Sequence, residues 1–436
     1  MSASRIRKVL IITYYWPPCG GAGVQRWLKF TKFLPEYGWQ PFVLTVDPDY
    51  ASYGQTDLTL LKEVDQDLLV YRTRTLEPYN LYKVFTSQKK IPVGGFSGNS
   101  KVSFTEKISR FIRGNLFIPD SRRGWIPFAI KQAKKVINRE KIDVVITTGP
   151  PHSSHLIGSR LKKIRNIKWI ADFRDPWTDI YYYPDLFHSR LAKYLDLRLE
   201  RKVISNCDHL VTVSNSLGKL LQEKVSQPID HKISIIPNGF DQDDFPASAI
   251  IYPGKFHITY TGTLAKSYHI DEFILALSEL PDGIKENILI RFVGIVPPEI
   301  IRNFHSAGLE HQLELVDYVP HKQSVEYMLN SAVLLLAIPD LPKNELILTG
   351  KLFEYMAAGR PILCIGPVNG DAAAIISGTS SGVCVDYTDR AAMVQAITDY
   401  YKLFLENRLL VKNHQAAQYS RKSLTGQLSG ILEGLF

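Results

Sequence analysis

The chain has 436 residues, of which 45% are hydrophobic and 22% are charged, a composition typical of a folded globular protein. This composition excludes a disordered, collagen-like or coiled-coil chain, and the length predicts two or three domains. The 52 Lys and Arg residues outnumber the 43 Asp and Glu residues, and the net charge of +9 favours a negatively charged partner: nucleic acid, anionic lipid or a phosphorylated substrate.

Most of the excess charge lies in one short stretch. Residues 101–140 hold ten basic and three acidic residues, so they carry +7 of the total, whereas a protein that wraps DNA spreads its basic residues more widely. Within residues 101–117, apolar positions with helical spacing, including Phe111, interleave with Lys107, Arg110 and Arg113. This pattern predicts a helix that docks on an anionic membrane surface, or alternatively a solvated basic face over a core helix.

The spacing of the cysteines and the length of the apolar runs indicate the compartment in which the protein works. The four cysteines show neither metal-ligand spacing nor a disulfide framework, which favours a reducing cytoplasm. The N-terminal segment lacks a signal-peptide core, and the longest apolar runs fall far short of the roughly 20 residues that span a bilayer. We therefore expect a cytoplasmic protein that meets a membrane only from its surface, on the inner face.

Short apolar segments alternate with amphipathic ones along the first half of the chain. The apolar segments are brief and bounded by turn residues, as buried parallel strands are: 9–13, 40–46, 143–147, 169–172 and 209–213. Helical spacing of apolar residues predicts helices over 25–34, 128–137, 153–163, 189–204 and 216–224. This alternation predicts an α/β domain with a doubly wound parallel sheet over residues 1–245.

The alternation begins again in the second half. Predicted strands cover 257–261, 288–293, 313–316, 333–337 and 361–365, and predicted helices cover 270–280, 324–329 and 351–358. Residues 246–255 are predicted to be a linker and 256–414 a second α/β domain. A final amphipathic helix is expected within 415–436. Two such domains predict a central cleft in which ligands bind at the carboxyl ends of the strands.

A glycine-rich segment, Cys19 to Gly23, follows the first strand and precedes the first helix. Such a turn, with Gly21 at its centre, lets a ligand approach the backbone and aims the helix N-terminus at an anion. The spacing differs from G-x-G-x-x-G, which disfavours a hydride-carrying dinucleotide. The alternative is a tight turn that needs a positive φ.

Two polar motifs follow later strands of the first domain. In residues 149–155, His152 is placed for acid/base work or phosphate binding, with a packed or capping role as the alternative, while His155 favours a packed role. In residues 172–179, Arg174 stands between Asp172 and Asp175 at a strand end. These charges form either a functional cluster or an internal ion pair that fixes the loop.

Two motifs of the second domain suit a diphosphate. Thr349 and Gly350 open a short helix whose free N–H groups bind anions, Lys351 adds a positive charge, and Glu354, one turn on, can accept from both ribose hydroxyls. The alternative for this motif is a capped surface helix.

The other motif, residues 260–266, ends a strand in a turn of small residues, with Gly262, Thr263 and Lys266 as candidate phosphate ligands. The alternative is an exposed lysine.

These motifs, in this order, resemble glycosyltransferase family 4 (group 1), of the bacterial polysaccharide and glycolipid type. Five segments carry the resemblance. In the first domain, residues 172–177 resemble the family's E-x-R-D-L-W, residues 211–214 its V-x-V-S and residues 236–241 its I-P-N-G-x-D. In the second domain, residues 260–264 resemble the opening strand and residues 350–359 resemble G-K-x-x-E-Y-x-A-x-G. The sequence departs from the family at Leu346, where many members have a first glutamate and where Glu345 is one residue out of register. It also departs at Thr263 and Tyr268, where Arg and Lys are common.

The resemblance implies a GT-B fold of two Rossmann-like domains and a last helix that packs back on the first domain. It implies transfer of a sugar from a nucleoside-diphosphate sugar to a saccharide or lipid-linked acceptor, with retention of the anomeric configuration. Glu354 would bind the ribose, Gly21 would face the ligands, and Lys266 and residues 349–351 would bind the diphosphate. His152, Arg174 and Asp175 would be the catalytic residues, with His152 and Asp175 facing the sugar and acceptor, and no metal or other cofactor is expected.

Two alternatives stay open at this point. The first is a catalytically silent glycosyltransferase-like scaffold, which the leucine at position 346 suggests. The second is a polyanion- or nucleic-acid-binding α/β protein, which only the basic balance supports, because no nucleic-acid-binding motif is present and no nucleic-acid partner is expected.

Overall fold

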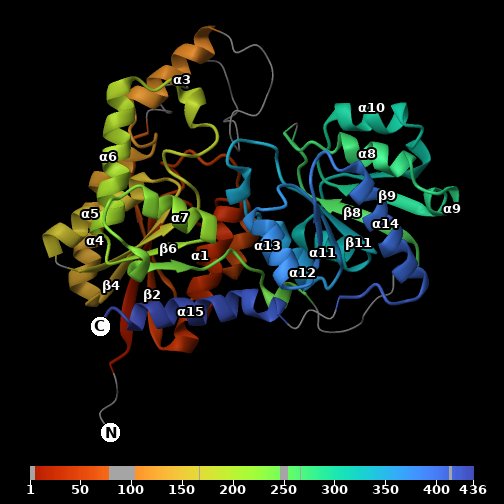
Figure 1. Cartoon of the computed structure of the whole chain (residues 1–436). Helices are drawn as coiled ribbons and strands as arrows, with labels where there is room; N and C mark the ends of the chain where they lie inside the picture. Colours follow the sequence, from red (N-terminus) through yellow and green to blue (C-terminus); the bar gives the residue numbers. More distant parts are fainter. Residues whose placement is uncertain (1–4, 78–103, 166, 246–253, 266, 412–414) are drawn as a thin grey trace. The chain divides into compact units, whose positions relative to one another are not determined.

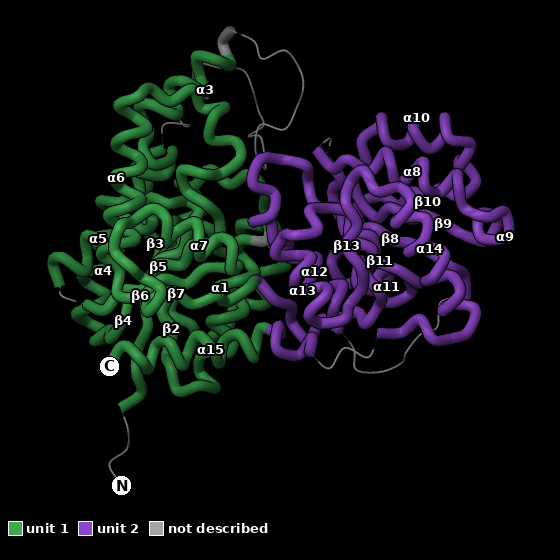
Figure 2. Tube along the Cα trace, in the orientation of Figure 1, with its two compact units in different colours: residues 1–237, 421–436 green, residues 238–420 purple. Residues whose placement is uncertain are grey.

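The computed structural model describes residues 5–77, 104–165, 167–245, 254–265, 267–411 and 415–436. The chain forms two compact units, residues 1–237 with 421–436, and residues 238–420 (Figure 2). Each unit is a parallel β-sheet with helices on both faces, which confirms the predicted fold class. The unit boundary after Pro237 lies before the predicted linker, of which residues 246–253 lie outside the described residues.

The first unit is built on a seven-stranded sheet in which every adjacent pair is parallel. In spatial order the strands are β3 (Leu69–Thr73), β2 (Trp39–Val46), β1 (Arg7–Ile12), β4 (Val144–Gly149), β5 (Lys168–Phe173), β6 (His209–Thr212) and β7 (Ile233–Ile235). The chain runs outward from β1 through β2 to β3 and then returns to place β4 on the other side of β1. The direction of winding therefore reverses between β1 and β4.

Helices cover both faces of this sheet because successive strand residues point to opposite sides. Leu10 and Ile12 join the core beneath α4 to α7, whereas Val9 and Ile11 join the core beneath α1 and α15 (Figure 1). The helices of the unit are α1 (Ala22–Phe33), α3 (Phe104–Leu116), α4 (Ile126–Glu140), α5 (Ser153–Arg165), α6 (Arg190–Asn206), α7 (Asn215–Glu223) and α15 (Arg421–Glu433). The last of these returns from the chain's end to pack along α1.

The second unit has a six-stranded parallel sheet. Its strands in spatial order are β10 (Leu313–Val316), β9 (Ile288–Val293), β8 (Phe256–Thr261), β11 (Val333–Ala337), β12 (Ile362–Ile365) and β13 (Gly382–Val385). The covering helices are α8 (Asp271–Ser278), α9 (Asp282–Lys285), α10 (Pro298–Ser306), α11 (His321–Leu329), α12 (Gly350–Ala357), α13 (Asp371–Gly378) and α14 (Arg390–Leu405). Here the winding reverses between β8 and β11.

The strands that sequence patterning misses are β3, β7 and β13. Each lies at an edge of its sheet and is only partly buried, so its residues do not form the continuous apolar run of a central strand. The structure also adds α9, α10, α13 and α14 to the predicted helices.

A buried carboxylate joins the elements of the first unit. Asp172, near the end of β5, accepts hydrogen bonds from Arg26 Nη2 at 3.0 Å and Trp27 Nε1 at 2.9 Å, both from α1, and from Thr148 Oγ1 of β4 at 2.8 Å. Arg26 is fully buried and also donates to the Pro237 carbonyl at 2.8 Å. Asp172 therefore makes an internal ion pair, but its partner is Arg26 of a distant helix and not the adjacent Arg174.

Removing the Asp172 carboxylate should destabilise the first unit. In Asp172→Ala, the Arg26 guanidinium stays buried without its counter-charge, which typically costs about 3–5 kcal/mol. All six tryptophans lie in this unit, so tryptophan fluorescence during urea denaturation reports its unfolding selectively. The exposed Asp230→Ala is the matched control and should change the unfolding free energy by less than about 0.5 kcal/mol. Equal stability of the two variants would contradict the role assigned to Asp172.

Candidate active site

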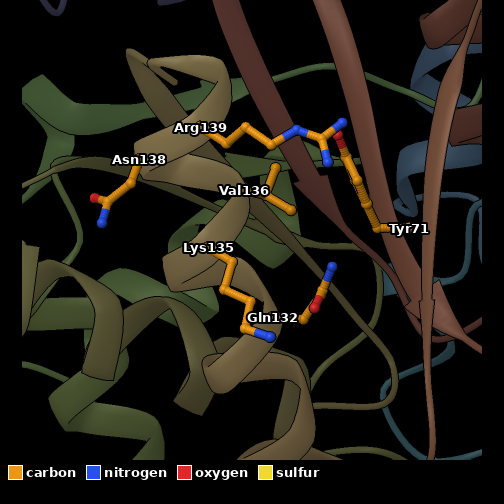
Figure 3. Close-up of a pocket in the computed structure, with 6 residues that line it drawn as sticks. All are labelled: Tyr71, Gln132, Lys135, Val136, Asn138 and Arg139. Carbon is orange, nitrogen blue, oxygen red and sulfur yellow. The ribbon is translucent and has the colours of Figure 1, made fainter.

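In open α/β sheets, ligands bind outside the carboxyl ends of the strands, where the winding reverses. Two cavities of the first unit lie elsewhere. One, of about 580 Å³, is lined by Tyr71 of β3 and by α4 residues that lead into β4 (Figure 3). The other, of about 510 Å³, lies between the end of α6 and the segment that leads into β7. Both are at the amino ends of strands, so the loops at the two reversal points are the candidate site.

The glycine-rich turn after β1 leads directly into α1. Gly21 is the N-cap residue of α1, is exposed, and has a φ of +100°. No side chain caps this helix, and its first turn holds no acidic residue. The positive φ explains the glycine, which is the alternative left open by the sequence, and the uncapped N–H groups remain open to an anion.

Arg174 fastens this turn to the loop after β4. Its Nη1 donates to the Gly23 carbonyl at 2.9 Å, its Nη2 to the Pro150 carbonyl at 2.7 Å, and its Nε to the Gly149 carbonyl at 3.2 Å. Burial lowers the pKa of Arg174, and the Asp172 carboxylate opposes that shift. Every guanidinium nitrogen thus binds backbone, so in this structure Arg174 shapes the loops.

The two histidines after β4 are packed among aromatic rings. His152 is 8% exposed and stacks on Trp177, with ring centroids 4.9 Å apart. Burial, followed by the nearby His155, holds the pKa of His152 well below its usual value. His155 is fully buried against Thr147, and burial lowers its pKa to about 3. Both rings are therefore neutral at pH 7.

Asp175 is differently placed. Its side chain is half-buried, burial raises the pKa of its carboxyl, and the Arg174 guanidinium lowers it. None of the described residues makes a hydrogen bond to this carboxylate. The loop around it is anchored to α6, because Trp177 Nε1 donates to Asp196 at 2.7 Å and Thr178 Oγ1 donates to Glu200 at 2.5 Å. Asp175 therefore differs from Asp172, whose carboxylate is buried and hydrogen-bonded.

Helix α3 presents an apolar stripe to solvent. The exposed side chains are 42–64% accessible and recur at helical spacing: Ile108, Phe111, Ile112 and Leu116. Lys107 and Arg113 are exposed beside them, whereas Arg110 is only 7% exposed and pairs with Glu106 at 2.6 Å.

The helix is fixed to the loop before α6 (Figure 1). Asn115 Nδ2 donates to the Phe187 carbonyl at 3.1 Å, and Asn115 Oδ1 accepts from Ser189 N at 2.7 Å. The apolar stripe is therefore held outward by contacts of the helix with the rest of the first unit.

In the second unit, the N-terminus of α12 meets the turn after β8. Thr349 caps the helix, because its Oγ1 accepts from Lys351 N at 3.1 Å. Lys351 Nζ donates to the Tyr260 hydroxyl at 2.9 Å, which in turn donates to the Thr263 carbonyl at 2.9 Å. Gly262 has a φ of +102°, and a Cβ there would lie 2.7 Å from Lys351 Cε. The lysine therefore lies against the turn in a place that only glycine leaves open.

The predicted diphosphate ligands are thus brought together in part. Gly262, Lys351 and the turn at Gly350 lie close together, and Thr263 is exposed. Lys266 lies outside the described residues. The sequence signals missed Tyr260, because a tyrosine inside an apolar strand looks like an ordinary core residue.

Desolvation changes the pKa of Lys351. It lowers the pKa of this lysine from 10.5 to about 8, and the Glu354 carboxylate opposes the shift. At pH 7 the ammonium group is therefore mostly protonated, and an added anion would favour the charged form further.

Glu354 lies one turn into α12 and contacts a residue that the sequence analysis did not single out. His321 Nε2, at the start of α11, lies 3.1 Å from Glu354 Oε1. Glu345 and Leu346 are in a 3-10 turn, Asn344–Leu346, that precedes α12. No sequence signal marked His321, because its pairing with Glu354 arises only from the way two helices converge.

Metal-binding clusters and membrane-spanning helices are both absent from the described residues. No group of three or more His, Cys, Asp or Glu side chains is arranged to hold a metal ion there. Across the same ranges, no helix is both long and apolar enough to cross a membrane.

Solved structures share this fold along nearly the whole chain. Sucrose-phosphate synthase from Thermosynechococcus elongatus aligns with a TM-score of 0.64 and 16% identity over 99% of both chains. HepE from Anabaena, solved in complex with UDP-glucose, aligns at 0.60 and 13% over 98% of this chain and 99% of its own. WaaG, a glycosyltransferase involved in lipopolysaccharide biosynthesis, aligns at 0.55 and 14% over 98% and 100%. No curated protein sequence matches the chain.

The two parallel-sheet units and these neighbours define a protein with the GT-B glycosyltransferase fold. The family model for Glycosyltransferase Family 4 matches residues 92–244, and the model for Glycosyl transferases group 1 matches residues 241–423. The chain therefore belongs to the family 4, group 1 glycosyltransferases, as the sequence resemblance predicted.

The depressed pKa of Lys351 predicts that the second unit becomes more stable as pH rises above 8. A lysine whose pKa in the folded state is about 8 binds fewer protons than it does in the unfolded chain between pH 8 and 10.5, so raising the pH favours the folded state. Relative to Lys351→Met, the wild type should gain on the order of 1–2 kcal/mol between pH 7.5 and 9.5. Pulse proteolysis in urea, with fragments of residues 267–411 identified by mass spectrometry, measures this difference. If the difference in unfolding free energy between the wild type and Lys351→Met does not change with pH, this prediction is wrong.

Proposed function

We propose that this glycosyltransferase takes its sugar from a nucleoside-diphosphate sugar bound at the N-terminus of α12. The observation that carries the proposal is a cluster at the start of α12. Thr349 caps the helix, Lys351 lies against the turn at Gly262, and Glu354 follows one helical turn later. The cluster combines the positive end of a helix dipole and an ammonium group for the diphosphate with a carboxylate for the ribose hydroxyls. HepE, which shares the fold, was solved with UDP-glucose, and this supports a donor of that class.

The departing diphosphate would be stabilised without a metal ion. The positive end of the α12 dipole and the Lys351 ammonium would face the negative charge that develops as the glycosidic bond to the diphosphate breaks. Lys351 suits this role because the Tyr260 hydroxyl holds its Nζ in place, so little reorganisation is needed. The residues of the site thus supply the electrostatic stabilisation that a metal ion provides in other transferases.

The acceptor would bind at the first unit, and the configuration at the anomeric carbon would be retained. Of the three predicted catalytic residues, Asp175 has the open carboxylate and would orient the acceptor hydroxyl. Arg174 would shape the loops through its backbone contacts, and His152 would line them as a neutral ring. A saccharide or lipid-linked acceptor in cell-surface polysaccharide or glycolipid synthesis fits best, and WaaG, of the same fold, acts in lipopolysaccharide biosynthesis.

Helix α3 would dock the enzyme on the anionic inner surface of the cytoplasmic membrane. Its exposed apolar stripe suits the interface, and Lys107 and Arg113 beside it attract anionic headgroups. Arg110 would contribute indirectly, through its pair with Glu106. An acceptor anchored in that membrane would then lie near the unit proposed to bind it.

Substituting Glu354 by Ala should weaken donor binding. Losing hydrogen bonds to one or two ribose hydroxyls should raise the donor KM by roughly 10- to 100-fold, since bonds to a charged group contribute about 1.5–3 kcal/mol each. Transfer and hydrolysis assays with a panel of UDP-, GDP- and dTDP-sugars first identify the donor and then measure the change.

The matched control is Glu326→Ala, an exposed glutamate on the neighbouring α11, which should leave KM unchanged. Unchanged kinetics in a folded Glu354→Ala protein would refute the assignment of α12 as the ribose site. Donor binding without turnover under any condition would instead favour the catalytically silent scaffold.

The α3 proposal predicts binding to lipid vesicles that depends on lipid charge. In flotation assays, the chain should bind vesicles that contain anionic phosphatidylglycerol more strongly than vesicles of phosphatidylcholine alone. Phe111→Ser with Leu116→Ser should lower the bound fraction by removing apolar contacts, and Lys107→Gln with Arg113→Gln should lower it by removing charge.

The control variant is Leu405→Ser, which changes a 64% exposed leucine of the second unit and should bind as the wild type does. Binding that is indifferent to lipid charge, or equal loss in the control, would count against a docking role for α3.

A further inference from the structure

The contact between His321 and Glu354 joins two helices of the second unit at its candidate ligand edge. His321 is the first residue of α11, which follows β10, and Glu354 is the fifth residue of α12, which follows β11. Their side chains are 52% and 29% exposed, and Nε2 and Oε1 are 3.1 Å apart. Because both helices begin at the carboxyl edge of the sheet, the pair lies at the edge where ligands bind in this class of fold.

The chemistry of the pair settles which atom donates. A carboxylate only accepts hydrogen bonds, so His321 Nε2 carries the proton and donates to Glu354 Oε1. No described residue makes a hydrogen bond to Glu354 Oε2. One oxygen of the carboxylate is thus held by the imidazole, while the second oxygen and the remaining lone pair of the first are open to hydroxyl donors.

We propose that His321 is a positioning residue that fixes the Glu354 carboxylate for the donor ribose and thereby strengthens selection of ribose over 2′-deoxyribose. This inference rests on the proposed role of Glu354. A partly exposed glutamate samples several rotamers, and ordering it on binding costs free energy. The imidazole orders it beforehand, in an orientation that can accept from two adjacent hydroxyls together, whereas a 2′-deoxyribose offers only one of them.

The test is calorimetric binding of UDP, GDP and their 2′-deoxy counterparts to the full chain. His321→Ala should weaken binding of the preferred ribonucleoside diphosphate roughly three- to tenfold, as expected for losing one preordered side chain. It should also reduce the ratio of ribose to 2′-deoxyribose affinity. His321→Gln should restore most of both, because its amide N–H can donate to Glu354. In the transfer reaction, His321→Ala should raise the donor KM and leave kcat unchanged.

Two controls separate the positioning role from general damage. His305→Ala removes an exposed histidine of the same unit and should bind as the wild type does. In a protein that already carries Glu354→Ala, adding His321→Ala should cause no further loss, because the group it positions is gone.

The outcomes distinguish the two proposals. If Glu354→Ala weakens nucleotide binding but His321→Ala does not, the positioning role is refuted and the ribose site stands. If His321→Ala weakens binding equally with and without Glu354, His321 does not act through the carboxylate, and the proposal is likewise refuted. If none of the nucleotides binds, or Glu354→Ala changes nothing, the proposed function falls and the inference falls with it.

Discussion

The buried ion pair between Asp172 and Arg26 is the interaction on which the architecture of the first unit depends. Burying a carboxylate costs free energy unless its oxygens accept hydrogen bonds. The oxygens of Asp172, near the end of β5, accept hydrogen bonds from donors on α1 and β4. The arrangement fixes the start of α1, and with it the glycine-rich turn, beside the loop after β4. Two residues further along, Arg174 repeats the principle by binding three backbone carbonyls of those same loops. The ligand-facing edge of this unit is thus shaped by charges that themselves face inward.

In the second unit, a charged side chain also joins separate elements, and here it is a lysine. Lys351 is packed against the Gly262 turn and hydrogen-bonded to Tyr260, and burial lowers its pKa towards neutrality. Because desolvation lowers the pKa of this partly buried lysine, a bound anion would favour its charged form. The site therefore needs few charged side chains, since the N–H groups of α12 provide further positive potential.

The structure also refines the meaning of the chain's positive charge. Residues 101–140 carry most of it, but Arg110 and Arg122 are mostly buried and pair with Glu106 and Glu77. The charge available at the surface of this region is therefore smaller than the sequence suggests. Of the basic residues that remain, Lys107 and Arg113 flank the apolar stripe of α3, whereas Lys131, Lys134, Lys135 and Arg139 lie on α4. Of these two helices, only α3 therefore combines exposed cations with an exposed apolar stripe, the combination typical of a lipid interface.

The sequence by itself determined the two α/β units and the central strands, because a buried parallel strand is recognisable from its own few residues. The sequence also located the helix that begins after Thr349 and the position of Glu354 on it, since capping and helical spacing are local properties. Only the tertiary structure decided that Asp172 pairs with Arg26, 146 residues away, that Lys351 reaches Tyr260 across 91 residues, and that His321 meets Glu354. These partners come from separate strands and helices, and their proximity follows from the order in which the sheets are wound. Edge strands such as β7 escaped sequence analysis for the same reason, because only pairing with a neighbour makes them strands.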